Sequence, residues 1–97
     1  MISYEKVLPI GTVVTLDDSD ARLMIMGYQR YDAGNAKIYD YCACTYPEGY
    51  ISDDNTLLFD HEQIHRVIYV GLQNAEQSAF SDKLRGIIEE RKSTVAE

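Results

Sequence analysis

The sequence predicts an α+β fold, in which a small antiparallel sheet of five strands forms an SH3-like barrel or a strongly curved sheet and a C-terminal amphipathic helix follows. Two observations lead to this prediction. Across residues 8–72, short β-branched and aromatic runs alternate with turn residues, which is typical of antiparallel strands. Across residues 74–92, apolar residues recur at helical spacing instead. Because 97 residues suffice for one hydrophobic core, we expect residues 1–97 to form a single domain.

The strands are predicted from runs of apolar residues that end at turn-forming residues. The five runs are residues 12–16, 22–28, 37–46, 56–59 and 66–70. The first three are separated by short polar stretches, so we expect them to form a meander. Asp60 is expected to cap a single helical turn before the last strand, because aspartate accepts hydrogen bonds from free backbone N–H groups. A helical turn at that place favours the SH3-like arrangement.

The only two cysteines, Cys42 and Cys44, lie two residues apart in the third predicted strand. Alternation places both side chains on the same face, with Cα atoms near the upper limit for a disulfide. We therefore expect two reduced cysteines that serve as small buried residues.

The charge of the chain argues against several classes of partner. Sixteen acidic residues against nine basic ones give a net charge of −7, which disfavours nucleic acid and anionic membrane surfaces. No stretch approaches the roughly 20 apolar residues that cross a bilayer, and the first residues lack the pattern of a signal peptide. We therefore expect a cytoplasmic location.

The segment His61-Glu62-Gln63-Ile64-His65 has the H-E-x-x-H form of zinc peptidases. On a helix the two histidines share a zinc ion and the glutamate acts as general base. Here a strand-like run follows at once, so only about one helical turn fits, and charged Asp60 and Arg66 flank the motif. We expect a capped turn without metal, cofactor or catalysis, and keep a zinc hydrolase using His61, Glu62 and His65 as the alternative.

Two regions are predicted to contact a partner, a tyrosine-rich turn and the apolar stripe of the helix. Tyrosines give large contact areas at low entropic cost, and amphipathic helices often bind partners. On the helix we expect Phe80 to pack on the sheet, while Ile87, Ile88 and the charged half up to Lys92 project away from it. The predicted contact residues are Tyr46, Pro47, Glu48, Gly49 and Tyr50 in the turn, and Leu84, Ile87 and Ile88 on the helix.

Several segments in order resemble one known family over residues 8–80. They are Leu8–Val14, Leu23–Gly27, Tyr39–Tyr41, Tyr46–Tyr50 and Phe59–Gly71, and they resemble the family called domain of unknown function 4176. The resemblance implies a small protein of Gram-positive bacteria that is encoded near type VII secretion genes and their LXG-type toxins. It implies no catalytic residues.

The expected function is therefore a non-enzymatic adaptor, targeting factor or chaperone-like protein. The partner that the resemblance implies is a cognate LXG toxin or a secretion component. Besides the zinc hydrolase, a simple homodimeric structural domain remains as an alternative.

Overall fold

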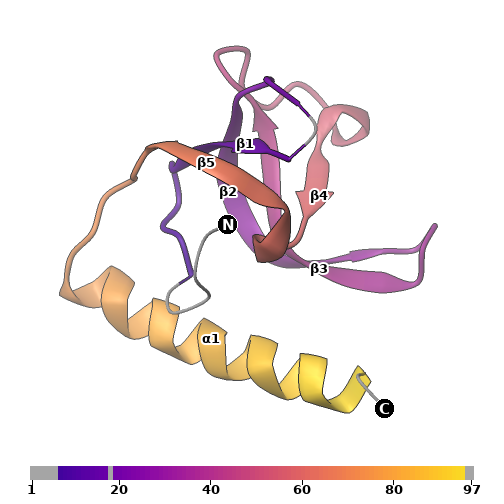
Figure 1. Cartoon of the computed structure of the whole chain (residues 1–97), viewed down its shortest axis with the longest axis vertical. Coiled ribbons are helices and arrows are strands. Elements are labelled where there is room, and N and C mark those ends of the chain that lie inside the picture. Colours follow the sequence, from indigo (N-terminus) through magenta and orange to yellow (C-terminus); the bar gives the residue numbers. More distant parts are fainter. Residues whose placement is uncertain (1–6, 18, 96–97) are drawn as a thin grey trace.

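The computed structural model describes residues 7–17 and 19–95 and shows a five-stranded antiparallel sheet with one long helix at its side (Figure 1). The strands run in the spatial order β4-β3-β2-β1-β5. In chain order the elements are β1 (Val13–Leu16), β2 (Leu23–Asp32), β3 (Lys37–Thr45), the 3₁₀ turn η1 (Asp53–Asn55), β4 (Leu57–Phe59), the 3₁₀ turn η2 (His61–Gln63), β5 (Ile64–Tyr69) and α1 (Ala75–Val95).

This arrangement confirms the predicted α+β class. Of the two predicted forms, the sheet is the open one and does not close into a barrel. Strands β4 and β5 lie at its two edges and do not pair with each other in the described part of the chain. Strand β4 has only three residues, which leaves little backbone for closing a barrel. The 3₁₀ turn η2 separates it from β5, as expected, with Asp60 as N-cap residue. The Asp60 N–H donates to Oε1 of Gln63 at 2.8 Å.

The predicted meander of β1, β2 and β3 is present, but its hairpin is longer than expected. Strand β2 continues to Asp32 because its pairing with β3 persists beyond the left-handed residue Gln29 (φ 53°). At the other end of β3 the predicted turn is found, with a cis peptide bond before Pro47. The Gly49 N–H donates to the Thr45 carbonyl at 2.8 Å, and Gly49 has the positive φ of 81° that suits glycine.

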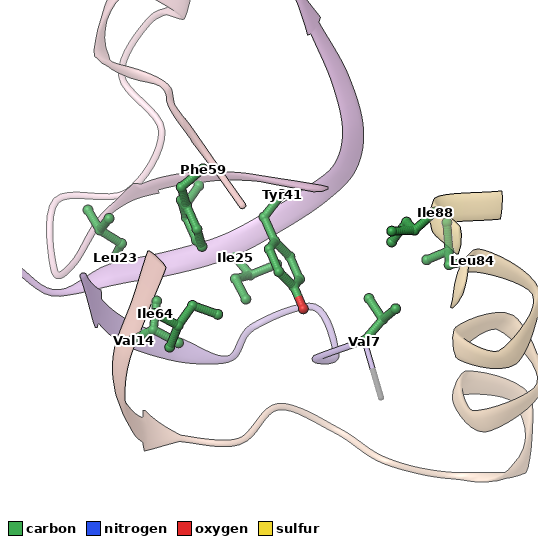
Figure 2. Close-up of a cluster of buried hydrophobic side chains, with 10 residues drawn as sticks. Val7, Val14, Leu23, Ile25, Tyr41, Phe59, Ile64, Leu84 and Ile88 are labelled. Atoms are coloured by element: carbon green, nitrogen blue, oxygen red, sulfur yellow. The ribbon is translucent and has the colours of Figure 1, made fainter. Parts of the chain in front are cut away.

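The hydrophobic core lies between the inner face of the sheet and α1. Figure 2 shows side chains of the sheet, among them Ile25 and Phe59, grouped together, while Leu84 and Ile88 of α1 lie beside Val7. Tyr41 stands between these groups, and Figure 2 shows its hydroxyl directed toward Val7. The helix therefore completes the core, with Val7 and Tyr41 bridging it to the sheet.

The helix is turned differently from our expectation. Ile88 is 1% exposed and Leu84 6%, so both belong to the core and present no surface to a partner. Phe80, which we expected to be buried, is 52% exposed and only flanks Tyr28, at 6.0 Å between ring centroids. The inward face passes instead through Ser81, whose hydroxyl donates to the Val7 carbonyl at 3.2 Å. Ser81, Leu84 and Ile88 share one helical face, and their contacts turn that face of α1 toward the core in place of the face that carries Phe80.

Candidate interaction site

The first histidine of the H-E-x-x-H segment is part of the buried structure. The Tyr41 hydroxyl lies 2.7 Å from His61 Nδ1 and accepts the Leu8 N–H at 3.1 Å, so its own proton is available to the histidine. The His61 N–H donates to Asp40 Oδ2 at 2.9 Å. Burial raises the pKa of Tyr41 above its ordinary value, which keeps this hydroxyl protonated. His61 thus holds η2 against β3, and the Tyr41 hydroxyl links this contact to the N-terminal segment.

The second histidine is not placed to share a metal ion with the first. His65 is exposed on β5, and its Nδ1 lies 3.9 Å from Asp17 Oδ1. The segment forms a 3₁₀ turn followed by a strand, so its residues lack the i, i+4 geometry of the zinc-binding helix. Among the residues described, no group of three or more His, Cys, Asp or Glu side chains could hold a metal ion.

A buried carboxylate holds the charged end of α1 against the sheet. Asp40 is 0% exposed, and its Oδ1 lies 2.6 Å from Arg91 Nη2 while its Oδ2 lies 3.2 Å from Lys92 Nζ. Lys92 also reaches Glu62 at 3.0 Å, and Arg91 donates to the Ile38 carbonyl. We call Asp40, Arg91 and Lys92 the clasp. The expectation that this half of the helix projects away from the sheet is therefore wrong, because its cations neutralise a buried carboxylate.

The face of the sheet opposite the core carries a groove. Val13 pairs with Met24 on one side and Tyr69 on the other, and Met24 pairs with Cys44. Directly paired residues share a face, so these side chains lie together. Cys42 and Cys44 are buried and free, as predicted. The groove has a volume of about 460 Å³ and is lined by Gly11, Val13, Arg22, Met24, Tyr46, Ile68 and Tyr69. We call it the outer groove.

The walls of the outer groove are exposed aromatic and aliphatic side chains. Tyr46 is 48% exposed, Ile68 47% and Tyr69 63%, while Val13 is only 7% exposed. Most of the lining is therefore apolar, and much of it is open to solvent. An exposed apolar hollow with tyrosines at its sides has the composition of a protein-binding surface.

The structure separates the residues that we predicted to contact a partner. Of the turn, Tyr46 lines the outer groove, whereas the Tyr50 hydroxyl donates to Asp53 at 2.7 Å, away from the groove lining. Pro47 and Glu48 are exposed and Gly49 is half-buried, and none of the three lines the groove. On the helix only Ile87 stays exposed, at 48%. The two predicted regions do not form one surface, because α1 packs on the core side of the sheet.

Sequence reasoning missed most of the outer groove. Its lining comes from β1, β2 and β5, from Gly11 and Arg22 just before β1 and β2, and from Tyr46 after β3. Only the sheet register shows that Met24 and Tyr69 flank the same Val13. A usable signal was present in residues 67–69, where consecutive apolar residues occupy the edge strand β5. Such a run places apolar side chains on both faces, including the one that the core does not cover.

No helix in the described residues is long and apolar enough to cross a membrane.

Comparisons with known proteins identify a family for this fold. No curated protein and no solved structure matches the chain. One family model matches residues 7–80, which include all five strands and the start of α1. Since that match covers more than half of the sequence, the chain belongs to the family described as domain of unknown function (DUF4176).

Proposed function

We propose that this protein is a non-enzymatic adaptor that binds a protein client through the outer groove. The supporting observation is the groove itself, where Tyr46 and Tyr69 stand beside a floor formed in part by Val13. Tyrosine and methionine are enriched at protein interfaces, and both line this hollow. In the described part of the chain no other element covers Tyr46 or Tyr69, which remain half-exposed or more.

The client that we propose is a cytoplasmic LXG-type toxin or a component of the type VII secretion system. This choice rests on the family resemblance of the sequence and on the net charge of −7, which favours a protein over a nucleic acid. In this role the adaptor acts as a targeting or chaperone-like factor before export of the toxin.

Co-expression with the product of the neighbouring LXG gene tests the proposal. We expect the toxin to co-purify with the wild-type chain. A Tyr46→Ser/Tyr69→Ser double variant should bind the toxin at least about 10-fold more weakly, because interface hot spots are enriched in tyrosine and the truncation of such a residue costs more than about 1 kcal/mol. Both side chains are exposed, so the variant should fold normally.

Ile87→Ser is the matched control, since it removes an exposed apolar side chain from α1. If this control loses the toxin while the tyrosine variant keeps it, the helix is the interface and the groove is not. If neither the toxin nor any other product of the locus binds the wild-type chain, the adaptor proposal fails.

For the H-E-x-x-H segment we propose a structural role in place of zinc catalysis. The supporting contacts are those of His61 with Tyr41 and Asp40, which embed the first histidine in the core. Protein purified without added zinc should contain no stoichiometric zinc by elemental analysis. His65→Ala should change the free energy of unfolding by no more than about 0.5 kcal/mol, because the side chain is exposed. One tightly bound zinc ion per chain would contradict this role.

The alternative of a homodimeric structural domain is decided by sedimentation. We expect the isolated chain to be a monomer whose mass increases only with a client. A stable dimer that Ile87→Ser dissociates would favour the structural alternative.

A further inference from the structure

The outer groove carries a positive charge although the protein as a whole is strongly acidic. Among the residues that the structure describes, Arg22 is the only charged one in the groove lining, in a chain of net charge −7. Within residues 7–17 and 19–95 Arg22 forms no ion pair, whereas Arg91 and Lys92 are held in the clasp. An arginine without an anion beside an exposed apolar surface is a ready partner for a carboxylate.

The backbone places this arginine next to the aromatic wall. The Arg22 carbonyl accepts the Tyr46 N–H at 2.9 Å, so the two residues are fixed side by side. Leu23, the next residue along β2, is 4% exposed, which anchors the chain at the start of the strand. Arg22 and Tyr46 therefore stand together at one end of the groove, while Ile68 and Tyr69 of β5 supply the other wall.

A second arginine lies further along the same face. Thr15 pairs with Arg66, and Thr15 is two residues from Val13 in β1, so alternation directs both toward the outer face. Arg66 is exposed and, among the described residues, also forms no ion pair. The outer face thus combines apolar side chains with two arginines.

We propose that the outer groove binds an extended segment of the client in which large apolar residues lie two positions before and after an acidic residue, so that all three side chains leave the segment on the same side. The carboxylate pairs with Arg22, and the apolar side chain two positions away enters between Tyr46 and Tyr69 over Met24 and Val13. This inference rests on the proposed function and specifies which kind of client segment the site takes. The charge of Arg22 is the feature that favours an acidic segment here, although the net charge of the whole protein is −7.

Peptide titration monitored by amide resonances tests this without the client. The probes are the capped peptide Gly-Leu-Ser-Glu-Ser-Phe-Gly, whose Leu, Glu and Phe share one face when extended, and two analogues with Gln or Lys in place of Glu. We expect shifts at Arg22, Met24, Tyr46, Ile68 and Tyr69. The Glu peptide should bind roughly fivefold tighter than the Gln peptide, and the Lys peptide should bind most weakly, since an exposed ion pair has an effect of that size. High salt should reduce the difference.

An Arg22→Gln variant assigns the preference to one residue. In this variant the Glu and Gln peptides should bind with affinities equal within about twofold, because the variant lacks the guanidinium that makes the exposed ion pair. Glu48→Gln is the matched control, as it removes a charge from the neighbouring turn without altering the groove lining. It should leave the Glu preference in place.

Several outcomes overturn the inference. They are equal binding of the three peptides, a Glu preference that survives Arg22→Gln, and the absence of groove shifts at millimolar peptide. Binding of N-acetylglutamate amide as tightly as the Glu peptide would also overturn it, since that result indicates an anion site with no apolar selection. None of these bears on whether the toxin needs Tyr46 and Tyr69, so the proposed function is tested separately by the co-purification experiment.

Discussion

Replacement of Asp40 by asparagine is expected to release the C-terminal half of α1 from the sheet. The wild-type carboxylate is fully buried and contacts Arg91 at 2.6 Å, Lys92 at 3.2 Å and the His61 N–H at 2.9 Å. Asparagine has nearly the same shape and keeps one acceptor oxygen for His61. The substitution therefore removes the negative charge that the two cations face, with little change in packing.

The size of the effect follows from the burial of each partner. Removing one member of a buried ion pair costs about 3–5 kcal/mol when the remaining charge stays buried. The Arg91 side chain is 16% exposed and that of Lys92 is 34% exposed, and both lie near the end of α1, where local opening can hydrate them. Lys92 also keeps Glu62. We therefore expect a loss of about 2–3 kcal/mol in the free energy of unfolding.

Urea denaturation and native-state hydrogen exchange together measure this prediction. Denaturation should report the loss of stability, and the amides of residues 87–92 should lose more protection than those of β2 and β3. Glu89→Gln is the control, because Glu89 is exposed on the same stretch of helix and its change should stay within about 0.5 kcal/mol. The reasoning about the clasp is refuted if Asp40→Asn is as stable as this control and α1 keeps its protection.

Three further predictions concern the helix, a close backbone contact and alkaline pH. Ile88→Ala should destabilise the fold by about 2–5 kcal/mol in denaturant titrations, while Ile87→Ala, at a half-exposed position, should cost no more than about 1 kcal/mol. Gly71→Ala should cost about 3 kcal/mol or prevent folding, because its Cβ would lie 2.0 Å from the Ile10 carbonyl oxygen; Gly86→Ala on α1 meets no atom within 4 Å and should raise the melting temperature, with a gain of about 1 kcal/mol. Burial raises the pKa of Tyr28 from 10.0 to about 12, so the folded state holds its proton more tightly than the unfolded state; the resulting stability is complete below pH 10 and is lost as the pH rises from 10 to 12. Tyr28→Phe should therefore flatten the dependence of the unfolding midpoint on pH in that window, and an unchanged slope would contradict the assignment.

The sequence by itself determined the local structure of this protein. The predicted helix at residues 74–92 corresponds to α1 at Ala75–Val95, and the predicted runs correspond to the five strands. The two cysteines are free, as their spacing indicated. These features depend on side-chain periodicity and turn chemistry between neighbouring residues, which a sequence displays directly.

Only the tertiary structure decided which side chains are buried on the helix and which charges meet. Phe80, Leu84, Ile87 and Ile88 form one stripe about 100° wide on α1, and periodicity alone does not say which edge of it faces the core. Contacts with Val7, more than 70 positions away, bury the edge with Leu84 and Ile88 and leave Phe80 and Ile87 exposed. In the sequence, Asp40 likewise does not differ from other polar strand residues, and only the fold places Arg91 beside it. The outer groove arises in the same way, from strands whose register sets Met24 and Tyr69 on either side of Val13. In each case the energy comes from contacts between segments distant in the chain, and such contacts leave no trace in local sequence pattern.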